Sequence, residues 1–362
     1  MRSRIRTVCR VVLSGWEHGE AQHLSLTHRE DDMHSLKTKR LVTLFSTAAV
    51  AALLAGAPAI AADDINVRFS WKLKGEYGFF YHGQEEGVYE ERDLNVTFGE
   101  GAGAQAALGA LLQGQEDVVV LPGIFAISAI QQGMPVKLVA LYQPAAPIVL
   151  ISHEDNPVTV PADLEGKSVA HAVGETGTSY LDAFCLMNDI DCGSVNKVQM
   201  DAGSRVPQFM QRQVDVVSVY QTNDLPVLVD RVGYDFPTLD LAEYGLSVPG
   251  LAAVVSDEAL ENNADALRRF IEATNEAIEL TNADPDAATQ TLMSVWSGGP
   301  SESVQREQIV ATSDSIVQVE GHPFGWIEES AIADALALIS STDNVGELKP
   351  LDTFYSNALL TE

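Results

Sequence analysis

The residues best suited to chemistry lie between positions 71 and 81, directly after a stretch that alternates like a β-strand. This segment is dense in aromatic side chains, and aromatic rings supply a large contact area for flat ligands. Its two phenylalanines fit ordinary core packing. The side chains that we expect at a ligand site are Trp71, Glu76, Tyr77 and Tyr81.

A glycine-rich turn at residues 99–105 follows a second strand pattern. Glycine lets the backbone approach a ligand closely, and the start of a helix offers free N–H donors. The spacing is not the G-x-G-x-x-G fingerprint of dinucleotide binding, and a tight turn alone would also use these glycines. From this turn we expect Gly101, Ala102 and Gly103 at the site.

Two polar segments, residues 174–180 and 220–224, occupy similar places further along the chain. Hydroxyl and N–H groups at a helix start bind carboxylates, sulfonates or polar ring substituents, and the same hydroxyls can simply cap the helix. A carboxylate at a strand's end accepts hydrogen bonds from an amino-substituted ring, although solvated loop polarity explains it equally well. The expected site residues are Glu175, Thr176, Gly177, Thr178, Ser179, Tyr180, Tyr220, Asn223 and Asp224.

The sequence lacks the common catalytic constellations, since it has no G-x-S-x-G elbow, no H-E-x-x-H and no P-loop. Cys185 and Cys192 are either a disulfide formed in an oxidising compartment or two buried thiols. No His or further Cys accompanies them at zinc-ligand spacing. We therefore expect a binding protein rather than an enzyme, with no metal and no cofactor.

Alternating strands and helices must position these segments. Strand patterns at 65–70, 94–98, 117–121 and 136–141 alternate with helical patterns at 78–91, 104–113 and 124–132. The alternation resumes with strand patterns at 168–173, 197–200 and 214–220 and helical patterns at 179–187 and 205–211. After the run 251–256, helical patterns follow at 258–261, 265–280, 285–295, 303–312 and 328–339.

This alternation of strands and helices predicts an α/β fold of two lobes, each a mostly parallel sheet flanked by helices, with a helical C-terminal region. Lobe I comprises residues 65–150 plus 252–362, and lobe II comprises residues 151–251 with the hinge crossings. Two lobes joined by two crossing segments are typical of binding proteins that close around a hinge. Ligands of open α/β sheets bind beyond the carboxyl ends of the strands, which selects the segments named above.

The first 61 residues indicate export. An apolar run at 41–61 follows Lys37, Lys39 and Arg40 and ends in a small-x-small cleavage pattern, as in a secretory signal peptide. A membrane anchor is the alternative, but the run is Ala-rich and interrupted by Gly and Pro. Residues 1–32 are polar, so we expect Met33 to be the true initiator and the mature protein to be periplasmic.

The charge of the chain excludes several partners. It has 22 Lys and Arg against 51 Asp and Glu, and removing residues 1–61 leaves 14 against 46, a formal charge of −32. Nucleic acids and anionic lipid surfaces are bound through basic surface, which this chain lacks. We expect a small-molecule ligand and a monomeric protein.

The mature sequence resembles the periplasmic binding proteins of nitrate/sulfonate/taurine and thiamine-precursor ABC importers. The resemblance spans nearly all of it, and no single motif is decisive. It is carried by Trp71, Gly87–Val96, Gly133–Lys137, Leu164–Lys167, Gly174–Tyr180, Gln213–Asp215, Tyr220–Asp224, Tyr244–Gly245 and Phe270–Thr274.

This resemblance implies a carrier that delivers its ligand to a permease and its ATPase. Tyr142-Gln143-Pro144 and His322–Trp326 are closer to the pyrimidine-precursor branch, so Tyr142 and Gln143 join the expected site. In that branch Trp71 would stack on an aminopyrimidine and Asp224 would take the acidic role, where the branch usually has Glu. The alternatives are a small sulfonate, carboxylate or nitrate ligand, and a pyrimidine-synthesis enzyme of the same fold. The yeast-type enzymes use a Cys-rich motif that is absent here.

Overall fold

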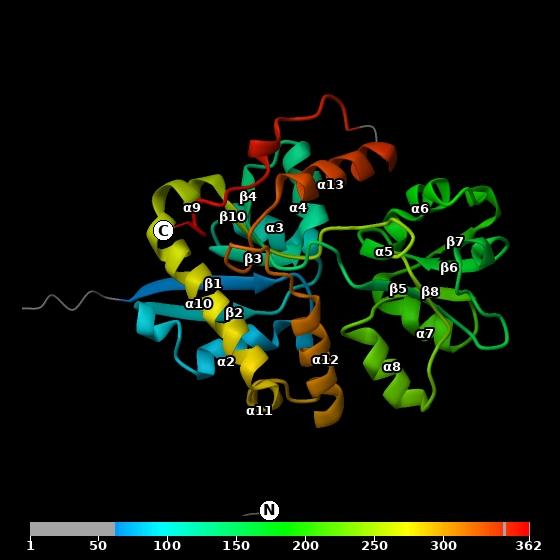
Figure 1. Cartoon of the computed structure of the whole chain (residues 1–362), viewed down its shortest axis with the longest axis horizontal. Helices are drawn as coiled ribbons and strands as arrows, with labels where there is room; N and C mark the ends of the chain where they lie inside the picture. The colour runs from blue at the N-terminus through cyan, green and yellow to red at the C-terminus, as the bar shows by residue number, and fades with distance from the viewer. Residues whose placement is uncertain (1–61, 343–344, 362) are drawn as a thin grey trace, which may run out of the picture. The chain divides into compact units, whose positions relative to one another are not determined.

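The computed structural model describes residues 62–342 and 345–361, so the expected signal segment and Met33 lie outside the described part of the chain. The described residues contain two five-stranded sheets, each flanked by helices (Figure 1). We call the first sheet and its helices lobe I, and the second sheet and its helices lobe II. None of the described helices is long and apolar enough to span a bilayer.

The sheet of lobe I has the strand order β2-β1-β3-β10-β4. Four of its strands run in one direction, and β10 runs antiparallel to its neighbours β3 and β4. The strands are β1 (Asp63–Phe69), β2 (Leu94–Gly99), β3 (Val118–Pro122), β4 (Val136–Leu141) and β10 (Leu251–Ser256).

The sheet of lobe II repeats this arrangement in the order β7-β6-β8-β5-β9. Here β5 is the reversed strand, antiparallel to β8 and β9. In each sheet the reversed strand is the one that the chain enters directly after crossing between lobes. The strands are β5 (Ile148–Ser152), β6 (Ser168–His171), β7 (Asn196–Gln199), β8 (Val216–Tyr220) and β9 (Thr238–Asp240).

Helices cover both faces of each sheet. In lobe I they are α2 (Gly78–Glu85), α3 (Ala104–Leu112), α4 (Gly123–Gln131), α9 (Asp257–Asn262), α10 (Ala264–Ala283), α11 (Pro285–Val295), α12 (Glu302–Ser315) and α13 (Glu329–Thr342). In lobe II they are α5 (Thr176–Ser179), α6 (Leu181–Met187), α7 (Arg205–Met210) and α8 (Asp224–Val232).

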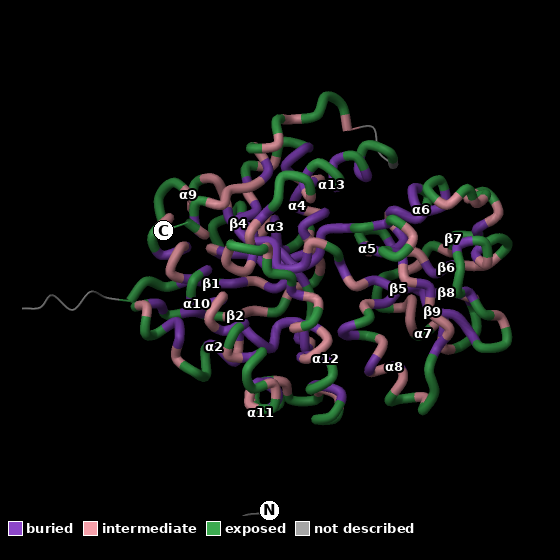
Figure 2. Tube along the Cα trace, in the orientation of Figure 1, coloured by how far each residue is buried: buried purple, intermediate pink, exposed green. Residues whose placement is uncertain are grey.

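The core lies on both faces of the central strands, which Figure 2 shows as buried segments inside an exposed shell. Successive residues of β3 alternate between two cores: Val118 and Val120 face α2 and α10, whereas Val119 and Leu121 face α3 and α4. The second of these cores continues into lobe II. Because β3 is buried on both faces, its sequence is a continuous run of apolar residues.

The predicted α/β fold with two lobes is confirmed, and four differences are informative. The helix predicted for 78–91 ends at Glu85, because Gly87 turns the chain with a φ of +79°. The strand predicted for 168–173 ends at His171, which leaves Val173 in a turn. Helix α8 was not predicted, and β5 lies across the predicted lobe boundary between residues 150 and 151.

Candidate functional site

The two crossings between lobes, residues 142–147 and 241–250, are tied together by Gln143, which is fully buried. Its backbone carbonyl accepts a hydrogen bond from the Gly250 N–H at 2.8 Å, and its Oε1 accepts one from the Leu251 N–H at 3.1 Å. Its Nε2 donates to Ser315 Oγ at 2.8 Å. The neighbouring Tyr142 is also buried. Gln143 therefore joins both crossings to α12.

A buried ion pair lies where the aromatic segment of lobe I meets lobe II. Lys74 Nζ is 2.6 Å from Glu76 Oε2, and it lies 5.4 Å from the ring centroid of Tyr77 and 4.8 Å from that of Tyr220. Burial is the largest single influence on the pKa of Lys74 and lowers it, but the Glu76 carboxylate and the hydroxyls of Tyr77 and Tyr220 together raise the pKa above its ordinary value. The pair is charged but has no net charge.

Asn223 receives two hydrogen bonds from lobe I. The Glu76 N–H donates to Asn223 Oδ1 at 3.1 Å, and Gln308 Nε2 on α12 donates to the Asn223 carbonyl at 2.7 Å. Asn223 and Gln308 are both almost completely buried. These contacts join lobe I to lobe II at one end of the cleft between the lobes. No sequence pattern indicated that Gln308 would be there.

The expected aromatic residues have different surroundings. Tyr77 is buried and stacks on Phe69 with centroids 4.1 Å apart, and burial raises its pKa to about 12. Tyr81 is half-buried near Phe69. Trp71 is 42% exposed. Tyr77 thus belongs to the core that supports Lys74, while Trp71 is free to contact solutes.

The glycine-rich turn packs tightly on this aromatic segment. The Gly101 N–H donates to the Trp71 carbonyl at 3.1 Å, and a Cβ at Gly101 would lie only 2.1 Å from the Phe69 carbonyl oxygen. Gly103 has a φ of +121° and donates to the Ser70 carbonyl at 2.7 Å. Both positions require glycine, because a side chain would clash or strain the backbone.

The polar groups of residues 175–180 mostly bind one another. Glu175 caps α5 by accepting hydrogen bonds from the Gly177 and Thr178 N–H groups, each at 2.8 Å, and it pairs with Arg205 at 3.6 Å. The Thr176 hydroxyl is 3.3 Å from the Tyr220 hydroxyl. The Ser179 hydroxyl donates to the Glu175 carbonyl, and Tyr180 is buried in the core.

Asp224, which was expected to take the acidic role, is exposed at the start of α8. Its Oδ2 accepts a hydrogen bond from the Tyr220 N–H at 3.0 Å. The carboxylate therefore stabilises the turn between β8 and α8 in this structure.

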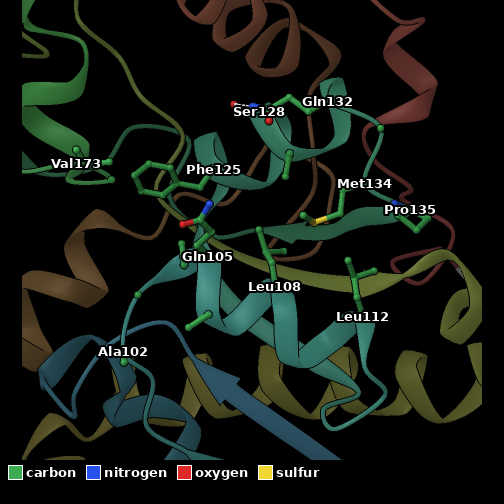
Figure 3. Close-up of a pocket in the computed structure, with 16 residues that line it drawn as sticks. Ala102, Gln105, Leu108, Leu112, Phe125, Ser128, Gln132, Met134, Pro135 and Val173 are labelled. Atoms are coloured by element: carbon green, nitrogen blue, oxygen red, sulfur yellow. Dashed lines mark hydrogen bonds between the residues drawn. The ribbon is translucent and has the colours of Figure 1, made fainter.

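A pocket of about 770 Å³ opens where α3 and α4 of lobe I face the turn after β6 of lobe II (Figure 3). Of the expected site residues, Ala102 and Gly103 line it. Lobe II contributes Val173 and Gly174, and none of the lining residues is charged. The other lining residues are Ala104, Gln105, Ala106, Leu108, Leu112, Phe125, Ser128, Ala129, Gln132, Gly133, Met134 and Pro135.

Sequence reasoning missed most of this pocket, although one signal was present. Ala104, Leu108 and Leu112 recur every four residues on α3 and form one helical stripe that faces the pocket. Such a stripe is typical of ordinary core packing, and the sequence alone does not show that it faces a pocket.

The two cysteines of the described chain lie in lobe II as free thiols. Burial raises the pKa of Cys185 to about 12, and Cys192 is half-buried with its Sγ 3.4 Å from the Asp182 carbonyl oxygen. No group of three or more His, Cys, Asp or Glu side chains in the described ranges is arranged to hold a metal ion.

Comparison with known proteins places the chain in a family. The family model described as NMT1/THI5 like matches residues 75–288, a range that contains all the residues lining the pocket. The chain belongs to the NMT1/THI5-like family. Among solved structures, the periplasmic aliphatic sulphonate binding protein SsuA of Escherichia coli is similar, with a TM-score of 0.65 and 16% identity over 83% of this chain and 99% of that one. This likeness shows the two-lobed periplasmic binding protein fold.

Two curated relatives are similar in sequence to this NMT1/THI5-like chain. One, from Brachyspira hyodysenteriae, bears the name ABC transporter periplasmic binding protein and is 25% identical over 56% of this chain and 53% of its own length. The other is the riboflavin-binding protein RibY of Chloroflexus aurantiacus, 27% identical over 46% of this chain and 47% of its own length. The chain thus spans about half the length of the curated relatives that it matches.

Proposed function

We propose that this NMT1/THI5-like protein is the periplasmic solute-binding protein of an ABC importer, and that it binds an uncharged, flat heteroaromatic molecule between its lobes. The observation that carries the proposal is the pocket of about 770 Å³, whose lining residues include no charged side chain, in a chain of formal charge −29. The curated relatives' names, a periplasmic binding protein and a riboflavin-binding protein, support the same role.

The charges around the cleft favour a neutral ligand over a bare anion. Lys72 faces Glu100 at 3.6 Å, Lys74 faces Glu76 at 2.6 Å, and Arg205 faces Glu175 at 3.6 Å. Each cation is therefore already compensated by a carboxylate. A nitrate or sulfonate bound there would have to compete with that carboxylate at close range, which costs Coulomb energy in a partly desolvated site.

The size and polarity of the pocket suit a ring system. Ligand pockets of about 300–1,000 Å³ are typically apolar with a few polar groups that orient the ligand. Leu108, Phe125 and Met134 supply apolar surface, whereas Gln105 and Gln132 offer both hydrogen-bond donors and acceptors. The thiamine pyrimidine precursor fits this chemistry, and so does the larger isoalloxazine of riboflavin, which would fill more of the volume.

A carrier role follows from the fold rather than from reactive groups. The cleft closes at one end through Asn223 and remains open at the pocket, so the lobes can enclose a solute and then release it to a permease and its ATPase. The alternative from another class is a pyrimidine-synthesis enzyme of the same fold. Turnover of pyridoxal phosphate or histidine by the purified protein would favour that alternative.

The test is a thermal-shift and calorimetry panel with riboflavin, the thiamine pyrimidine precursor, an alkanesulfonate and nitrate. A ligand at 100 times its dissociation constant adds about 2.7 kcal/mol to the free energy of unfolding, so binding should raise the melting temperature clearly. We expect at least one heteroaromatic to do so. Stabilisation by the anions alone would contradict the proposal.

A matched pair of variants, one on α3 and one at the residue directly after it, tests the location of the site. Gln105 and Gln113 are both exposed, but only Gln105 lines the pocket. Gln105→Lys should weaken binding of the neutral ring about tenfold by placing a desolvated charge beside it, whereas Gln113→Lys should leave affinity unchanged.

A further inference from the structure

We propose that Val173 is a specificity-determining residue of the pocket and that its side chain closes over the apolar part of the ligand bound against α3 and α4. This inference rests on the proposed function and deepens it, because it assigns to lobe II an apolar contact with the ring. Neither the family resemblance nor the loop polarity of residues 174–180 indicated such a contact.

The first observation is the exposure of Val173. It is 85% exposed, more than any other large hydrophobic side chain in the described part of the chain. It belongs to none of the hydrophobic cores. Covering an apolar side chain with another apolar surface removes it from water and is favourable. Val173 therefore packs into none of the cores of the described chain.

The second observation is the turn that carries Val173, which is fixed at both ends. The Glu175 N–H donates to the Ala172 carbonyl at 3.3 Å, which closes a turn with Val173 and Gly174 at its centre. Gly174 has a φ of +74°, the left-handed conformation that a type II turn requires at its third position. Glu175 caps α5 directly afterwards, and Ala172 is buried. Both ends of the turn are therefore fixed.

The third observation is what lies opposite. Val173 and Gly174 are the residues of lobe II that line the pocket, and the rest of its lining comes from lobe I. Figure 3 shows Val173 at the side of the pocket where the ring of Phe125 lies, with Gln105 nearby and Leu108 deeper along α3. A flat ring on the α3–α4 wall would present one face or edge to Val173.

The lining offers the ligand two kinds of contact. Phe125, Leu108 and Val173 supply apolar surface, and Gln105, Ser128 and Gln132 supply hydrogen-bonding groups. A small hydrated anion gains nothing from an apolar contact with Val173. The residue thus favours heteroaromatic rings with an apolar edge over sulfonates and nitrate.

The experiment compares Val173→Ser with Leu186→Ser, using riboflavin and the thiamine pyrimidine precursor as probes. Leu186 is the matched control, because it is 75% exposed on α6 of the same lobe and does not line the pocket. Both side chains are exposed, so both variants should melt as the unmodified protein does. Val173→Ser should weaken binding of the heteroaromatic probe about five- to tenfold, and Leu186→Ser should change it less than twofold.

A third variant separates shape from apolarity. Val173→Thr keeps the shape and replaces one methyl group by a hydroxyl, so its affinity should lie between those of the serine variant and the unmodified protein. Unchanged affinity in Val173→Ser, or an equal loss in Leu186→Ser, would overturn this inference while leaving the proposed function intact. Failure of the unmodified protein to bind either heteroaromatic would overturn the proposed function and this inference with it.

Discussion

Lys74 and Glu76 form their ion pair in a place where neither charge is well hydrated, since their side chains are only 17% and 5% exposed. Bringing two charges into such a site costs solvation energy, and their mutual attraction offsets that cost only while both are present. The aromatic rings of Tyr77 and Tyr220 shield the ammonium further. The pair therefore acts as one neutral unit.

Removing one member of this pair should be costly. Lys74→Met leaves the Glu76 carboxylate buried without its partner, so we expect the free energy of unfolding to fall by about 3 kcal/mol. The double variant Lys74→Met, Glu76→Met should recover most of that loss. Urea denaturation of the three proteins measures this, and a double variant no more stable than Lys74→Met would contradict it.

The same experiment has a defined pH dependence. The pKa of Lys74 is raised above its ordinary value of 10.5, so its stabilising contribution is fully present below that pH and is lost only as the pH rises through the folded-state pKa. The difference between the unmodified protein and Lys74→Met should therefore change little between pH values of about 7 and 9.

The cysteines offer a second prediction at the residue scale. Burial raises the pKa of the Cys185 thiol to about 12, so the thiol stays protonated at pH 8, and the thiolate is the reactive form. In the folded, reduced protein iodoacetamide should therefore label Cys192 much faster than Cys185. Peptide mass spectrometry with Cys192→Ser as the control measures this. Labelling of neither residue in urea until a reductant is added would instead show a disulfide.

Among the secondary-structure elements, those with strong local signals were predicted closely. The bounds of β4 and α11 match the predicted ranges, and α11 shows why: Asp284 accepts a hydrogen bond from the Ala287 N–H and Pro285 fills the first helical position. Strand direction has no such signal. Nothing in the apolar runs of β5 and β10 indicates that they are reversed, because an antiparallel central strand has the same pattern as a parallel one.

The start of helix α5 depends on one side chain, that of Glu175, so a substitution there tests how this element is stabilised. Glu175→Ala removes a cap that accepts hydrogen bonds from two backbone N–H groups, and it also leaves the half-buried Arg205 without its carboxylate. We expect a loss of about 2–4 kcal/mol in the free energy of unfolding. Ser256→Ala removes the simpler cap of α9, a single hydrogen bond to the Ala259 N–H, and should cost about 1 kcal/mol. Equal losses in urea denaturation would contradict this account.

For the whole molecule, the cleft is built from parts that are distant in sequence. The segments at strand ends were predicted because parallel strands place their following loops at one edge of a sheet. The contribution of α12 had no comparable signal. Gln308 reaches Asn223 only because the C-terminal helices return to lobe I and pack against Gly75, where a Cβ would lie 2.2 Å from Gln308 Cβ.

Gln308 should consequently control how firmly the lobes stay together, and Gln305 provides a matched control one turn away on α12. Both side chains are buried, but Gln305 Nε2 donates to the Pro300 carbonyl at 2.8 Å within lobe I, whereas Gln308 Nε2 donates to Asn223 in lobe II. The Glu76 N–H, which also donates to Asn223, reports on the contact by hydrogen exchange. Gln308→Leu should speed exchange at Glu76 about tenfold, because one interlobe hydrogen bond is lost, and Gln305→Leu should not. Equal exchange in the two variants would mean that Gln308 does not control the contact between the lobes.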